Sequence, residues 1–198
     1  MAGPLEFTDA SLLLAAASGE SNRVESALAA GARLEARDPT GRSALLLAVA
    51  GNHCEVAQLL VERGADPNAV DERLETPWLA TGVTGSVEML EILLPAGPDM
   101  TLKNRYGGIA IIPASERGHI DYVRRVATAG IDVNHVNDLG WTALLEAVIL
   151  GDGSTTYQEI VRILLNAGAD RELADRDGVT PAQHARTLGH HDLADVLS

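Results

Sequence analysis

A glycine returns along this chain at a nearly fixed interval. Gly31, Gly64, Gly97 and Gly130 are each 33 residues apart, and Gly168 follows after a longer gap of 38. A fixed period of this length indicates structural repeats that stack on one another, each too small to bury its own apolar face. The period therefore predicts a solenoid rather than a globule with a single core.

Other motifs recur in step with these glycines. Turn signals lie at 38–41, 137–140 and 175–178, and Thr-Pro pairs follow the turn at 76–77 and 180–181. An Ala-rich stretch comes next, and then a Gly-His pair at 118–119 and 189–190. Together these motifs resemble the ankyrin repeat over essentially the whole chain. The unbroken series of repeats looks like the stand-alone ankyrin repeat proteins that are common in bacteria.

The resemblance implies an all-α ankyrin-repeat solenoid of about six helix-turn-helix units with short β-turn or hairpin tips. We expect a single domain at 1–198. Its units are predicted at about 5–37 (an N-terminal cap), 38–70, 71–103, 104–136, 137–174 (with an insertion) and 175–198 (a C-terminal cap).

Local rules place the ends of the helices. Ser43 is positioned to cap a helix at 44–50, and Thr76, Thr142 and Thr180 hold the same place in their units. Proline follows at 77 and 181, where the first helical position needs no N–H. The glycines at 64, 97, 130 and 168 are expected to supply the left-handed residue that ends each second helix.

Two units depart from the pattern. In the third, Leu74 replaces the turn glycine, Gly82 lies within the first helix, and Pro95 falls late in the second helix. Because proline removes a helix hydrogen bond, this unit is predicted to be the weak point of the stack. The fifth unit is five residues longer, and the extra residues lie near 151–155, between its two helices.

The net charge of the chain limits the classes of partner that it is expected to bind, and one apolar run bears on its location. The chain carries 15 basic and 28 acidic residues, a net charge of −13. Such a chain is not expected to bind nucleic acid or an anionic membrane, since both require many Lys and Arg. The apolar run at 12–17 is too short to cross a membrane, and no basic residue precedes it. The chain is therefore predicted to be cytoplasmic, or periplasmic or secreted if a leader was removed.

No arrangement of residues indicates catalysis, so we expect no enzyme and no cofactor. The loop at 151–155 lacks the lysine of a phosphate-binding loop and the acidic spacing of a calcium loop. His184, His190 and His191 lie near one another in sequence without the spacing of a metal site, and Cys54 is the single cysteine. No metal site is predicted. Binding of a small ligand or metal at this loop or at these histidines stays an alternative.

A protein-binding surface is better supported, since in ankyrin stacks the turn tips and first helices line a concave face that binds partners. Carried over position by position, this face has outward positions on its first helices that include Leu47 and Glu146. An apolar patch of Tyr106, Leu139 and Trp141 is predicted on adjacent tips, although Trp141 can also serve as packing; Trp78 is predicted to be a core residue. The predicted protein-binding residues are Arg42, Glu75, Arg105, Tyr106, Leu139, Trp141 and Glu146.

These residues predict a non-catalytic module that binds another protein. The acidic balance would favour encounter with a basic partner, and the chain itself is predicted to be a monomer. A different class of function stays open as well, in which the chain self-associates as a structural or scaffold protein.

Overall fold

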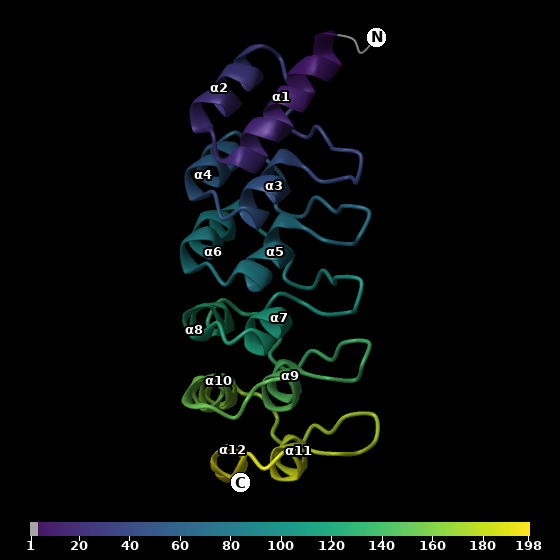
Figure 1. Cartoon of the computed structure of the whole chain (residues 1–198), viewed down its shortest axis with the longest axis vertical. Helices are drawn as coiled ribbons and strands as arrows, with labels where there is room; N and C mark the ends of the chain where they lie inside the picture. The colour runs from purple at the N-terminus through teal and green to yellow at the C-terminus, as the bar shows by residue number, and fades with distance from the viewer. Residues whose placement is uncertain (1–3) are drawn as a thin grey trace. The chain divides into compact units, whose positions relative to one another are not determined.

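The computed structural model describes the backbone of residues 4–198 and the side chains from Thr8 onward (Figure 1). Residues 1–3, which belong to the domain predicted at 1–198, lie outside the described residues. Within the described part every regular element is a helix, which confirms the all-α prediction. None of these helices combines the length and the apolar composition that crossing a bilayer requires.

The helices form two compact units, which meet between Leu102 and Lys103 in the sequence. In the first unit, α1, α3 and α5 pack side by side in one row, and α2, α4 and α6 pack in a second row (Figure 1). The bounds are α1 (Pro4–Ser18), α2 (Ser21–Ala29), α3 (Ala44–Ala50), α4 (Cys54–Glu62), α5 (Pro77–Thr84), α6 (Val87–Leu93) and the 3-10 helix η1 (Leu94–Ala96).

The second unit has the same two-row arrangement. The helices α7, α9 and α11 form one row, and α8, α10 and α12 form the other. Their bounds are α7 (Ile111–Glu116), α8 (Ile120–Ala127), α9 (Ala143–Ile149), α10 (Thr155–Asn166), α11 (Pro181–Thr187) and α12 (His191–Val196).

The cores between the two rows are built from small and aliphatic side chains, with a few large ones. Leu46, Leu60 and Leu90 are almost fully buried in the first unit, as Tyr122 and Leu164 are in the second. Trp78 on α5 is also fully buried, which confirms its prediction as a core residue.

The predicted caps are confirmed. The Ser43 hydroxyl accepts a hydrogen bond from the Leu46 amide at 3.2 Å, and α3 covers the predicted helix. Thr76, Thr142 and Thr180 cap α5, α9 and α11 in the same way. Each cap satisfies a backbone N–H that the first turn of a helix leaves without a partner.

The ends of the second helices are confirmed as well. The glycines at 64, 97, 130 and 168 all have positive φ, between 73° and 95°. In the third repeat, α6 ends at Leu93 and the chain tightens into η1, which contains Pro95. Leu74 has a φ of 59°, a left-handed conformation that is strained for a leucine.

The insertion forms a packed link between α9 and α10. A Cβ added at Gly151 would lie 2.5 Å from the Tyr157 ring, and one added at Gly153 would overlap the His190 ring. The Tyr157 hydroxyl donates to the Glu116 carbonyl at 2.9 Å. The link is therefore packed against two rings, that of Tyr157 on α10 and that of His190, the residue before α12.

Candidate functional site

The candidate site is built on five-residue loops, called tips here, at 38–42, 71–75, 104–108, 137–141 and 175–179. In each tip the first backbone N–H donates to the carbonyl of the fifth residue, at 2.9–3.1 Å. The first side chain, always Asp or Asn, accepts from the backbone N–H groups of the third and fifth residues. Asp and Asn favour such turns because their short side chains reach the backbone two residues ahead. The frame of each tip is thus set locally.

Two of these tips carry the predicted apolar residues of the second unit. Tyr106 and Leu139 have 58% and 56% of their surfaces exposed. The Asp138 amide donates to the Tyr106 carbonyl at 2.9 Å, and His135 Nε2 contacts the Gly107 carbonyl at 2.7 Å, so the two tips are tied together. We call Tyr106, Leu139 and Trp141 the apolar tip surface.

Trp141, the third member of this surface, is less exposed, and Arg105 lies beside the surface. Trp141 is the fifth residue of its tip and is half-buried, so it combines packing with partial exposure. The guanidinium of Arg105 lies 4.7 Å from the centre of the Tyr106 ring, a cation–π contact. Arg105 therefore orders the ring from one side.

Glu146 is not on the surface, and the prediction that its position faces outward is wrong. Only 6% of Glu146 is exposed, and Asn137 Nδ2 donates to its Oε1 at 2.8 Å. Burial and the nearby charge of Glu116 raise the pKa of Glu146 to about 7, against a smaller lowering by the bond from Asn137. The reason is geometric, because this position on α9 packs beneath the tip. The matching positions at 47, 80 and 113 are buried too.

Asn137 is the site residue that sequence reasoning missed. Its Oδ1 accepts from the amides of Leu139 and Trp141, both at 3.0 Å, while its Nδ2 binds Glu146. One side chain therefore joins the displayed residues to the helix beneath them. Its place at the start of a turn signal predicted the turn, but nothing in the sequence predicted the bond to a residue nine positions later.

The two predicted residues of the first unit have separate surroundings. Arg42 is exposed and pairs through Nη2 with Asp38 Oδ2 at 2.7 Å. Glu75 is half-buried at the end of its own tip, where its amide donates to Asp71 Oδ1 at 2.8 Å. Arg42 is among the residues that line the pocket described next, and Glu75 is not among them.

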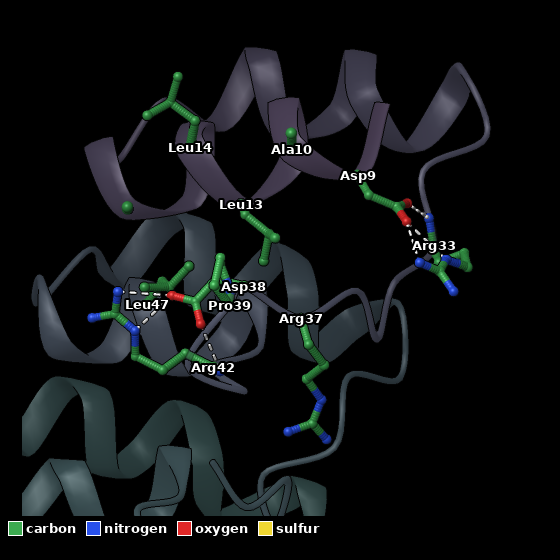
Figure 2. A pocket seen from close by; sticks show the side chains of 11 residues that line it. Asp9, Ala10, Leu13, Leu14, Arg33, Arg37, Asp38, Pro39, Arg42 and Leu47 are labelled. Carbon is green, nitrogen blue, oxygen red and sulfur yellow. Dashed lines mark hydrogen bonds and ion pairs between the residues drawn. The ribbon is translucent and has the colours of Figure 1, made fainter. Parts of the chain in front are cut away.

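The pocket has a volume of about 440 Å³ and lies between α1 and the tip at 38–42 (Figure 2). Leu13 points from α1 into this space, toward Pro39. Leu47 of α3, a position predicted to face the groove, lies at the base of the pocket and is 8% exposed.

Each acidic side chain of the pocket is paired with an arginine. Asp9 accepts from the Arg33 amide at 2.7 Å and from its Nε at 2.8 Å, and these bonds lower the pKa of Asp9. Burial raises the pKa of Asp38, but bonds from Thr40 and Arg42 outweigh it and lower the pKa to about 2. Sequence reasoning missed Asp9 and Arg33, because residues 24 positions apart form no local motif.

The histidines that were considered as an alternative ligand site contact other residues of the fold. His184 Nε2 lies 2.7 Å from Asp175 Oδ2, and the His190 ring packs against Gly153. Across the described side chains, no three histidine, cysteine or acidic residues gather as metal ligands.

The comparisons with known proteins agree with the repeat pattern of the sequence and with the helical fold. The family model for ankyrin repeats matches residues 5–71 and 78–171. The putative ankyrin repeat protein YahD of Escherichia coli (strain K12) is 38% identical over 189 residues, which cover 95% of this chain and 94% of that protein. An L-asparaginase of Dirofilaria immitis is 27% identical, but the match covers only 30% of that enzyme.

Two solved structures are similar over nearly their full length. A crystal structure of an ankyrin repeat domain from Acinetobacter baumannii AYE has a TM-score of 0.89 and 48% identity, and covers 94% of this chain and 95% of its own. The crystal structure of another ankyrin repeat protein has a TM-score of 0.91 and 36% identity, with 96% of both chains covered.

Proposed function

Because this chain belongs to the ankyrin repeat family, we propose that it is a non-catalytic module that binds another protein through its apolar tip surface. Ankyrin repeats generally serve as protein interaction modules, and the match to YahD, itself a putative ankyrin repeat protein, covers 94% of that protein. The observation that carries the proposal is the exposure of Tyr106 and Leu139 on two tips that are hydrogen-bonded to each other.

The tip surface is suited to binding because it is already ordered. Tyr106 is held by the tip frame and by the Arg105 contact, so little conformational entropy remains to be lost when a partner docks. Aromatic side chains with ordered surroundings are the residues on which interface energy usually concentrates. A partner would cover Tyr106 and Leu139 first and reach Trp141 at the edge.

The remaining predicted residues take different parts in this proposal. Arg105 orients Tyr106, and Glu146 supports the tip from beneath rather than touching a partner. Arg42 and Glu75 belong to the first unit and are not needed for binding at the apolar tip surface. The acidic net charge would speed encounter with a basic partner in the cytoplasm. The single domain at 1–198 and its repeat boundaries also stay predictions.

A capture experiment with matched variants tests the proposal. The wild-type chain and a Tyr106→Ala/Leu139→Ala variant are used side by side to capture proteins from the native lysate. A Leu150→Ala/Leu188→Ala variant is the control, since these leucines are 50% and 46% exposed on helix–helix links. We expect a protein that the wild type and the control retain and the tip variant loses.

Two results of this experiment would contradict the proposal. If the tip variant retains the same proteins as the wild type while its circular dichroism and melting are unchanged, the apolar tip surface is not the binding site. If the wild type instead forms larger assemblies that the tip variant cannot form, the surface serves self-association.

A further inference from the structure

From Thr8 onward, where its side chains are described, helix α1 is apolar on two faces, and only one of these faces is fully buried. Leu12, Ala15 and Ala16 are fully buried. On the pocket side, Ala10, Leu13, Leu14 and Ala17 follow the i, i+3, i+4, i+7 spacing of a helix stripe, and Leu14 is 59% exposed. This spacing is what a helix uses to pack against another element. The stripe is about 10 Å long, since a helix rises about 1.5 Å per residue.

The rim of the same pocket is cationic. The Arg33 and Arg42 side chains are 73% and 46% exposed, whereas their carboxylate partners Asp9 and Asp38 are only 7% and 13% exposed. Arg37 is exposed beside them and donates through Nη1 to the Gly41 and Val70 carbonyls. Figure 2 shows each carboxylate paired with its arginine, and the arginine is the more exposed member of each pair.

Each guanidinium keeps donors for a ligand. Arg33 and Arg42 use Nε and Nη2 on their aspartates, and Nη1 has no partner among the described residues. Arg37 uses Nη1 only. A guanidinium with an unused edge is well suited to a carboxylate, because it presents N–H donors in a fixed plane.

This concentration of positive charge contrasts with the rest of the chain. The segment 1–102 holds six basic and fifteen acidic residues, and half of its basic residues line this pocket. The pocket lining carries three arginines against two aspartates, so an acidic molecule meets less repulsion there than the net charge of −13 would give. An apolar floor with a cationic rim selects a ligand that carries both apolar and acidic groups.

We propose that this pocket binds an acidic, amphipathic peptide segment of another protein. A leucine- or phenylalanine-sized side chain would rest on Leu13, Leu14 and Leu47, and an Asp or Glu of the same segment would reach the arginine rim. A segment of several residues fits better than a small carboxylate, because the apolar stripe extends along two turns of α1. The site is a second one, and it rests on the proposed function only in that both describe recognition of proteins.

A peptide selection tests this proposal directly. The full chain is immobilised and panned with a library of short random peptides, in parallel with a Leu14→Glu variant. This change puts a negative charge on an exposed position of the stripe, so the fold should be retained. We expect the wild type to enrich peptides that combine Asp or Glu with Leu, Ile or Phe, and the variant to lose them.

The enriched peptides are then synthesised and titrated. Leu14→Glu and, independently, Arg42→Gln should each raise the Kd by about tenfold or more, and roughly 200 mM salt should weaken binding relative to 50 mM. Leu188→Glu is the matched control, because it makes the same change at an exposed leucine of the second unit. The Tyr106→Ala/Leu139→Ala variant should bind these peptides like the wild type, which separates this site from the apolar tip surface.

Several outcomes would overturn the proposal. It fails if no peptide is enriched, if basic peptides are enriched, or if folded Leu14→Glu binds them unchanged. Competition by glutarate that removes all peptide binding would mark the pocket as a small-carboxylate site. If sedimentation shows a dimer that Leu14→Glu dissociates, a second copy of this chain covers the stripe instead.

Discussion

The side chain of Asn137 makes three hydrogen bonds, two to its own tip and one to Glu146 on α9. Three tips begin with Asp, which offers the same acceptor for the tip amides but no N–H to give to a neighbour. The amide is therefore suited to this place, because the group beneath it is a carboxyl. A single polar side chain decides here how firmly Leu139 and Trp141 are presented.

Replacing Asn137 should loosen the tip. We expect Asn137→Ala to lower the free energy of unfolding by about 1–3 kcal/mol, because two tip amides and a buried carboxyl lose their partner. Chemical denaturation measures this loss. Asn137→Asp is the control, since it keeps the tip acceptor and should retain the tip while raising the pKa of Glu146 further. A loss below 0.5 kcal/mol, a rough limit for ordinary surface changes, would argue against the role of Asn137.

Glu146 should make stability depend on pH. Its pKa is raised from 4.5 to about 7 in the folded chain. The protonated form is thus the stabilised one: its contribution is complete below about 4.5 and is lost as the pH rises through about 7. We expect Glu146→Gln to leave stability nearly unchanged at low pH. Above neutrality it should add about 1–2 kcal/mol, a value reduced for solvent screening.

Thermal melting of both proteins across this pH range gives the test. The control is Glu172→Gln, which makes the same change at an exposed glutamate and shows how much of the effect comes from removing one negative charge from the chain. If Glu146→Gln shifted melting equally at low and high pH, the buried carboxyl would not be titrating in this range.

At the scale of elements, the link between α9 and α10 depends on a glycine at which an added Cβ would meet backbone as well as an aromatic ring. A Cβ at Gly151 would lie too close to both the Ala147 carbonyl and the Tyr157 ring. We expect Gly151→Ala to destabilise the chain by about 1–3 kcal/mol, since the helix backbone cannot easily move away. Gly108→Ala is the control, because its Cβ would meet only ordinary contacts with Asn104. Equal melting of the two variants would show that the link adapts.

At Leu74, by contrast, a substitution to glycine is expected to stabilise the chain. The left-handed conformation of Leu74 is strained, and its side chain is 52% exposed, so glycine there should relieve strain without removing core packing. We expect Leu74→Gly to stabilise the chain by up to about 1 kcal/mol. Hydrogen exchange of α5 and α6 in both proteins would show whether the third repeat gains protection. Faster exchange in the variant would mean that Leu74 packs more favourably than its exposure indicates.

The sequence predicted the elements that depend on neighbouring residues. The caps, the prolines that follow them and the glycines that end the second helices act within a few positions, and each was found as predicted. Burial of Glu146 was missed, because it depends on how a tip lies over a helix. The pocket was missed for a similar reason, since it joins Asp9 to Arg33 across two helices.

For the whole molecule, the net negative charge predicts the oligomeric state. We expect a monomer of 20.8 kDa over a roughly hundredfold range of concentration, since like charges on two copies repel each other. Sedimentation at low and moderate salt measures this mass. An increase in mass with concentration would favour the self-associating alternative and would redirect attention to the exposed leucines of α1 and the tips.

In each tip, the residues that set the backbone conformation differ from the residues whose side chains are exposed. In each one the frame needs an Asp or Asn at the first position and, in four of the five, a glycine at the fourth. The second, third and fifth positions contribute mainly backbone to the frame, although in the tip at 38–42 the Thr40 and Arg42 side chains also donate to Asp38. We therefore expect most of these positions to tolerate substitution without loss of the fold, so that the surface of the tips can change in evolution or in the laboratory while the repeats stay intact.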